Sequence, residues 1–149
     1  MSTGDSCLKR AESKMLPEII NLTQHQATPE QRATGVADLP EYLRKEVSQV
    51  ITFDEIPSPE EMKIRAQQVV GIFRRGQDVL SQEGTIPVGI SAMIGGAPFF
   101  MRPLEEALLA DGVEPVYAFS RRESADQPQS DGTVKKVAVF RHTGFVKVH

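Results

Sequence analysis

A histidine directly follows the first apolar stretch of the chain. Residues 18–23 predict a short strand, and Thr23, Gln24 and His25 stand at its end. An imidazole in that position can donate a hydrogen bond to a phosphate or transfer a proton near neutral pH. Thr23 and Gln24 would supply further hydrogen-bond donors. The alternative is that His25 is simply a polar turn residue.

A glycine pair stands where a second predicted strand, residues 86–94, gives way to a helix. Gly95 and Gly96 precede Pro98, which opens an amphipathic helix that ends near Gly112. Exposed backbone N–H groups and the helix dipole favour an anion at such a turn. The GGAP sequence is neither a dinucleotide-binding fingerprint nor a P-loop. A tight turn that needs glycine only to bend is the alternative.

An arginine pair follows the next predicted strand, residues 116–119. Ser120, Arg121 and Arg122 stand at its end, and arginine binds phosphate through a planar fork of donors. Because side chains alternate along a strand, Arg121 and Arg122 point to opposite sides, and Arg122 shares the face of Ser120. A salt bridge with Glu123 is the competing explanation for the pair.

The last predicted strand, residues 134–140, is followed by Arg141, His142 and Thr143. His142 would either bind a phosphate or cap the end of the strand. The turn dipeptide Asp131-Gly132 lies in a polar loop, residues 123–133, that is too short for a parallel crossover. The last two strands therefore form an antiparallel hairpin.

The elements that position these residues alternate as strand, helix and strand. Such units form parallel sheets with right-handed crossovers, and ligands bind beyond the carboxyl ends of the strands. We therefore expect a Rossmann-like three-layer α/β/α fold, with a mostly parallel sheet and a C-terminal antiparallel β-hairpin. A single domain spans residues 15–149 behind a disordered tail, residues 1–14.

Two capping signals start the remaining helices. In residues 28–31, T-P-E-Q predicts a capped helix that continues, broken near Gly35 and Pro40, to Val47. Residues 50–53 predict a second strand. Ser58-Pro59 then starts a helix with a core-facing stripe, which ends near Gly76 and is followed by a mobile segment, residues 77–85.

Composition limits the possible functions. The chain has 149 residues, 40% of them hydrophobic, and a net charge of -3, which fits one soluble domain. No apolar run approaches the roughly 20 residues that span a membrane, and the polar N-terminus lacks a secretory signal, so we expect a cytoplasmic protein. The single cysteine, Cys7, excludes an internal disulfide framework, and the three histidines are scattered, which argues against structural zinc.

Charge is distributed unevenly along the chain. Residues 1–119 carry 11 Lys and Arg against 17 Asp and Glu, whereas residues 120–149 carry six against three. A basic end on an acidic body indicates one local anion site rather than a surface for long nucleic acid, although a solvated hairpin explains it equally well. HExxH, CxxC and GxSxG motifs are absent. We therefore expect no metal and no cofactor, and any cleavage would rely on positioning and charge stabilisation.

Three segments together resemble the small CRISPR-associated proteins built on a single CARF-type domain, which include ring nucleases that degrade cyclic oligoadenylate. Residues 21–31 contain a strand end, a polar loop with histidine, and T-P-E-Q. Residues 88–119 form the strand-helix-strand core. Residues 120–146 contain R-R-E-S, an acidic turn, D-G, and V-F-R-H-x-x-F. The long region of residues 37–57 departs from a plain example.

The resemblance implies a homodimer that binds a cyclic oligonucleotide near its twofold axis, in type III CRISPR antiviral signalling. A ring nuclease of this kind would cleave without metal, by attack of a ligand 2′-hydroxyl on the neighbouring phosphate. His25 and Arg122 are then the candidate catalytic residues. The candidate ligand-binding residues are Thr23, Gln24, Gly95, Gly96, Ser120, Arg121, Arg141 and His142. The alternatives are a binding-only sensor or sponge, and an interaction module whose basic hairpin docks on an acidic partner.

Overall fold

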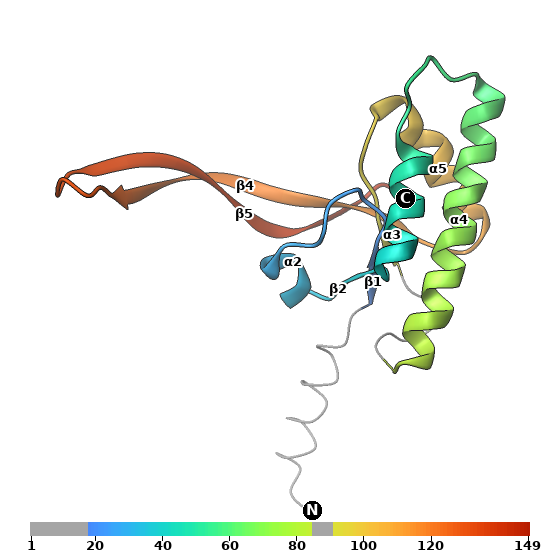
Figure 1. Ribbon diagram of the computed structural model, residues 1–149, viewed down its shortest axis with the longest axis horizontal. Coiled ribbons are helices and arrows are strands. Elements are labelled where there is room, and N and C mark those ends of the chain that lie inside the picture. Colours follow the sequence, from blue (N-terminus) through green and yellow to red (C-terminus); the bar gives the residue numbers. More distant parts are fainter. Residues whose placement is uncertain (1–17, 85–90) are drawn as a thin grey trace, which may run out of the picture.

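The computed structural model describes residues 18–84 and 91–149, which form an α/β fold with a mixed five-stranded sheet and four helices (Figure 1). The predicted tail, residues 1–14, lies outside the described residues, as do residues 86–90 of the second predicted strand. In chain order the elements are β1 (Ile19–Asn21), α2 (Pro29–Ala33), β2 (Val36–Asp38), α3 (Glu41–Ile51), α4 (Pro59–Gln82), β3 (Ser91–Met93), α5 (Pro98–Ala110), β4 (Pro115–Pro128) and β5 (Val134–Lys147).

The sheet has the strand order β2-β1-β3-β4-β5. Strand β1 pairs in parallel with β2 on one side and β3 on the other, and β3 pairs in parallel with β4. The final pair, β4 and β5, is antiparallel, as the short connection predicted. The chain leaves β1 toward one edge and β3 toward the other, so a topological switch point lies between β1 and β3.

The three longer helices, α3, α4 and α5, share one hydrophobic core with one face of the sheet. Strand residues Ile20 and Ala92 contact this core, together with Val47 of α3, Phe73 of α4 and Leu104 of α5. The opposite face holds a smaller cluster: Ala27, Val36, Met93 and Val116, with Ile19 and Phe145 packed against it. None of the helices in residues 18–84 and 91–149 combines the length and apolar composition that a membrane crossing requires.

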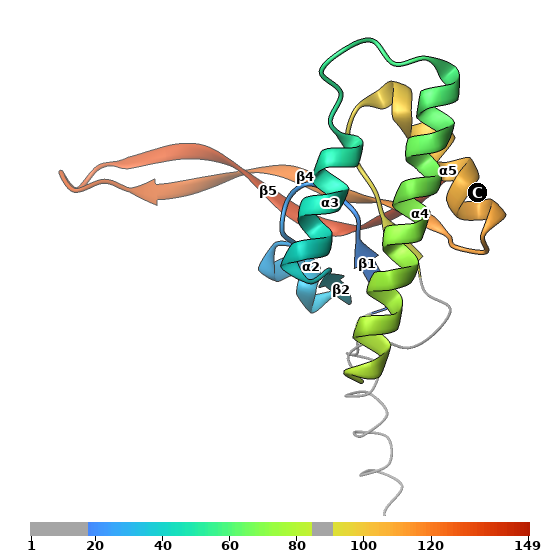
Figure 2. The same ribbon diagram turned by 45° about the vertical axis from the view of Figure 1, so that its right-hand side comes forward.

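The β4–β5 hairpin is much longer than the sheet to which it belongs. Only Pro115 and Val116 of β4 pair with β3, whereas the pairing with β5 continues to Pro128 opposite Val134. Beyond the sheet, residues 119–144 form a two-stranded ribbon, here called the arm, which extends away from the body in both views (Figures 1 and 2). At its tip, Asp131 Oδ1 accepts a hydrogen bond from the Thr133 amide, so the predicted Asp-Gly turn is confirmed.

The predicted lengths of the hairpin strands are wrong. Residues 123–128 of the predicted polar loop belong to β4, and β5 continues past residue 140 to Lys147. Arg141, His142 and Thr143 therefore lie within a strand rather than after it, next to a bulge opposite the Phe119/Ser120 step. Both faces of a projecting ribbon contact solvent, so its strands do not need alternating apolar residues. For this reason the polar sequence does not indicate that the strand continues.

The second predicted strand, residues 50–53, is also wrong. Val50 and Ile51 end helix α3, whose Leu43, Val47 and Ile51 recur every four residues and are buried. The true β2 lies in the region predicted as helix, where Gly35 turns the chain with φ +103°. A strand of three residues has no periodic pattern of its own, and β2 exists because β1 supplies its pairing partner.

Helix α4 continues to Gln82, so the predicted end near Gly76 and the predicted mobile segment from residue 77 are wrong over residues 77–82. Gly76 is buried inside the helix rather than at its end. A Cβ atom added there would lie 2.1 Å from Cδ2 of Leu39. The glycine therefore serves close packing between α4 and the chain after β2, whereas the predicted cap at Ser58 is confirmed by its bond from the Glu61 amide.

Candidate functional site

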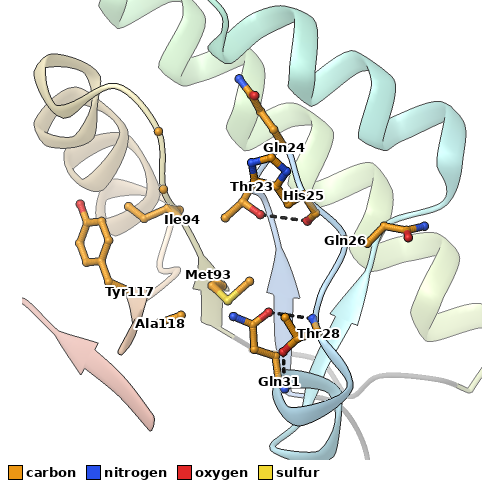
Figure 3. A pocket seen from close by; sticks show the side chains of 12 residues that line it. Thr23, Gln24, His25, Gln26, Thr28, Gln31, Met93, Ile94, Tyr117 and Ala118 are labelled. Carbon is orange, nitrogen blue, oxygen red and sulfur yellow. Dashed lines mark hydrogen bonds between the residues drawn. The ribbon is translucent and has the colours of Figure 1, made fainter. Parts of the chain in front are cut away.

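A hollow of about 470 Å³ lies beyond the carboxyl ends of β1 and β3, at the switch point of the sheet. Figure 3 shows the segment from Thr23 to Gln26 on one side and Tyr117 with Ala118 on the other. Five of the predicted site residues line it: Thr23, Gln24, His25, Gly95 and Gly96. The parallel topology brings these residues together at one edge of the sheet.

A buried asparagine fixes the loop that carries His25. Asn21, the last residue of β1, is only 2% exposed. Its Nδ2 donates to the His25 carbonyl oxygen at 2.7 Å and to Asp38 Oδ1 at 2.9 Å. Its Oδ1 accepts from the Thr23 amide at 2.9 Å and from the Thr23 hydroxyl at 2.7 Å. The turn after β1 is thus held by one side chain that the sequence analysis missed.

Asp38, at the end of β2, extends this network. Its carboxylate accepts hydrogen bonds from Asn21, from the Ala27 amide at 3.0 Å and from the Arg32 guanidinium at 2.9 Å. Burial raises the pKa of Asp38, but the hydrogen bonds from Arg32, Asn21 and Ala27 together lower that pKa below its usual value. Asp38 is therefore a charged anchor for both ends of the loop between β1 and α2.

The predicted capping box of α2 is confirmed and forms another wall of the hollow. Thr28 Oγ1 accepts from the Gln31 amide at 3.1 Å, and Gln31 Oε1 accepts from the Thr28 amide at 3.0 Å (Figure 3). Both residues line the hollow. A motif that starts a helix thus also positions two polar side chains at the site.

Three successive backbone amides at the glycine turn have no protein acceptor in the described part of the chain, and two of them, those of Gly95 and Gly96, belong to residues that line the hollow. Within the described residues, the amides of Gly95, Gly96 and Ala97 donate to no protein acceptor, and no side chain caps the start of α5. Gly96 has φ +143°, a conformation that favours glycine. Unpaired N–H groups at the start of a helix are suited to bind an anion.

Tyr117 is a lining residue that the sequence analysis did not identify. Its hydroxyl donates to Glu105 Oε2 on α5, and Glu105 Oε1 lies 3.0 Å from His149 Nε2. Burial and the neighbouring carboxylate raise the pKa of Tyr117 well above its usual value. The phenol therefore stays protonated at neutral pH. Its side chain packs beside the core helices, a position that no local sequence pattern indicates.

The predicted site residues of the hairpin do not line the hollow. Ser120, Arg121 and Arg122 are exposed on β4, where the arm leaves the body. The lining contains neither lysine nor arginine within the described chain. One cationic side chain, Arg44 of α3, lies next to Gln26 at the edge of the hollow. With the Gln26 amide oxygen turned toward α3, Arg44 donates to it at 3.2 and 3.3 Å.

Arg141 and His142 contact helix α2 instead. Arg141 lies 3.9 Å from a Glu30 carboxylate oxygen and 3.7 Å from Glu123. The His142 amide donates to Glu30 at 3.0 Å, and its Nε2 lies 3.2 Å from the Thr34 hydroxyl. These contacts hold the base of the arm against α2. The alternative salt bridge between Glu123 and the Arg121-Arg122 pair is not found among the described residues, because Glu123 pairs with Arg141 instead.

Fold and site together define an α/β protein with a hollow, lined by apolar surface and a few polar side chains, at the switch point of its parallel strands. The chain belongs to the family described as the uncharacterized protein MJ1673 family, whose model matches residues 17–146. The match covers every described helix and nearly all of the sheet. Neither the comparison with curated proteins nor that with solved structures found a match.

Proposed function

We propose that the protein binds a phosphorylated nucleotide in the hollow at the switch point, most concretely a cyclic oligoadenylate. The observation that carries this proposal is the set of unpaired amides at Gly95, Gly96 and Ala97, which face no competing protein acceptor among the described residues. Backbone N–H groups before a helix are donors for phosphate oxygens. Thr23, Gln24 and His25 supply side-chain donors on the opposite wall.

The size of the hollow supports one nucleotide unit per chain. Ligand cavities of about 300–1,000 Å³ enclose a small organic molecule, and this one measures about 470 Å³. A ring of four or more nucleotides exceeds that volume. A cyclic oligoadenylate would therefore occupy the hollows of two copies, in agreement with the homodimer that the resemblance to CARF-type proteins implies.

The same resemblance extends the proposal to the architecture and to the biological setting. The strand order supports this architecture: if both crossovers are right-handed, α2 and α5 would lie on opposite faces, because the chain moves in opposite directions after β1 and β3. We take the short α2 as the second helical layer of a reduced Rossmann-like fold. Type III CRISPR antiviral signalling is the setting in which such a ligand would be sensed.

Cleavage of the bound ring is the second candidate function, and His25 favours it. Its imidazole is the one histidine side chain in the lining, and it makes no hydrogen bond to a described residue. It is thus free to move a proton between a ligand 2′-hydroxyl and the solvent. Arg122, the other predicted catalytic residue, lies outside the lining, so its role depends on a second copy.

The first experiment measures binding of cyclic tetra-adenylate and cyclic hexa-adenylate by thermal shift and calorimetry. At about 100 times its dissociation constant a ligand adds about 2.7 kcal/mol, which for this chain length raises the melting temperature by about 5–10 °C. Incubation of labelled rings in EDTA then separates cleavage, which yields linear product, from binding alone, which returns the ring intact.

Two variants test the site, and a third is the control. Gly95→Ala places a methyl group at the turn in ordinary contact with Thr23 Cγ2, at 3.6 Å, so the fold is kept while the approach to the amides narrows. His25→Ala removes an exposed imidazole. Both should weaken binding about tenfold or more, whereas Lys63→Ala on the exposed side of α4 should not. If neither cyclic tetra-adenylate nor cyclic hexa-adenylate binds, the nucleotide proposal is refuted.

A further inference from the structure

The arm exposes apolar side chains that no described part of its own chain covers. Phe140 is 69% exposed and Val134 is 62% exposed. The register places Phe140 directly opposite Arg122, and Val134 directly opposite Pro128. Because side chains alternate, these residues lie on one face of the ribbon, with Lys136 between them. This face, here called the docking face, combines apolar anchors with the cations Arg122 and Lys136, and it also carries Asp126, which the register places opposite Lys136.

The arm is long and thin, and it receives little support from the body. Ten residues of β4 beyond the sheet span about 33 Å. A two-stranded ribbon is marginally stable in water, and among the described residues the arm contacts the body at its base, where Arg141 and His142 meet α2. A compact domain of this size has a radius of gyration of about 15 Å, so the arm can extend across a second molecule of the same size.

A matching surface lies on the body of the same chain. A groove of about 590 Å³ between the α3–α4 loop and the start of α5 has an apolar floor of Phe53, Met62 and Phe99. Ile56 stands in this groove with 98% of its surface exposed. Phe53 is held firmly, because its ring contacts Phe99 edge-on at 5.2 Å and the Arg65 guanidinium lies over it at 4.4 Å.

The charges of the two surfaces are complementary. Asp54 and Glu55 belong to the groove, whereas Arg122 and Lys136 belong to the docking face. In the part of the chain that the structure describes, none of these four has an ion-pair partner. The arm points away from its own body, so it does not reach its own groove (Figures 1 and 2).

We propose that the arm of one copy docks in the groove of a second copy, and that the exchange is reciprocal. Phe140 would cover the apolar floor while Arg122 and Lys136 meet the Asp54 and Glu55 carboxylates. A twofold exchange closes the assembly as a dimer, with the same contact made twice. The inference stands apart from the nucleotide proposal, since it concerns surfaces outside the hollow.

The test is the mass of the full chain without ligand, measured by sedimentation and light scattering. Wild type should be a dimer of twice the chain mass of 16.4 kDa. Phe140→Glu on the arm and Ile56→Glu in the groove should each raise the dimer dissociation constant by about 30-fold or more. Both side chains are exposed, so folding should be unchanged. Ile64→Glu on α4, at a site that is 58% exposed, is the matched control and should remain dimeric.

Mixing the two variants gives the sharpest outcome. A mixed dimer keeps one intact contact, between the unaltered arm of the Ile56→Glu chain and the unaltered groove of the Phe140→Glu chain. If one substitution already breaks a contact, the second substitution in that same contact adds little, and the mixture should contain more dimer than either variant alone. A wild-type monomer at about 100 µM would overturn the inference. So would an Ile56→Glu chain that stays fully dimeric, because arms that pack only against each other do not need the groove.

Discussion

Asn21 allows the most direct test of how the chain positions its candidate site. Replacing it with alanine removes hydrogen bonds to the Thr23 amide, the His25 carbonyl and the Asp38 carboxylate. A neutral hydrogen bond contributes about 1 kcal/mol net, and one to a charged group about 1.5–3 kcal/mol. Because Thr23 can still donate to the His25 carbonyl, we expect a total loss of about 3 kcal/mol in the free energy of unfolding.

The assay is thermal unfolding of Asn21→Ala beside wild type, with Gln67→Ala on the exposed side of α4 as the control. A loss of about 3 kcal/mol lowers the melting temperature by about 6–12 °C in a chain of this length. Hydrogen exchange should also speed up at the Thr23 and Ala27 amides, which the network holds. The Gln67→Ala chain should melt within about 2 °C of wild type.

Asn21→Asp adds a signature that depends on pH. The new carboxylate faces Asp38 Oδ1 in place of a donor 2.9 Å away, and repulsion between the two raises the pKa of the pair. A carboxyl whose pKa is raised in the folded state adds to the free energy of unfolding below that pKa, and this contribution is lost as pH rises through it. Asn21→Asp should therefore be least stable at neutral pH and recover toward about pH 5, unlike Asn21→Ala. If both variants melt like wild type at neutral pH, the network does not fix the loop.

Two further predictions concern packing and charge. Gly76→Ala should destabilise the protein by about 1 kcal/mol, because the new Cβ would lie 2.1 Å from Leu39 Cδ2. Gly71→Ala on the same helix places its Cβ within 4 Å of no atom, so it should stabilise the protein by a similar amount. Melting-temperature shifts of the same sign in the two variants would contradict this account. The pKa of Asp38 is lowered from 3.8, so its contribution to the free energy of unfolding is present above that value and is lost as pH falls through the lowered pKa. Asp38→Asn should therefore lower stability at neutral pH and flatten the acid side of the curve of melting temperature against pH. Parallel curves for the variant and wild type would contradict this prediction.

The sequence by itself determined the elements that carry a local signal. The capping box of α2, the Ser58 cap of α4, the helix after Pro98 and the Asp131-Gly132 turn are each specified by neighbouring residues, and all are present. The parallel arrangement followed from strand and helix alternation. That arrangement predicts that His25 and the glycine turn lie at the same edge of the sheet, and both line the hollow there.

Tertiary structure decided everything that depends on partners distant in sequence. Strand β2 forms because β1 lies beside it. Gly76 lies inside helix α4 rather than at its end, and Leu39 packs in the space that a side chain there would fill. The length of the hairpin follows from cross-strand pairing that polar residues such as Glu123 and Lys136 do not reveal. That length moves Arg121 and Arg122 out of the hollow. Local patterns fix what each segment can become, whereas pairing and packing fix where its side chains finally lie.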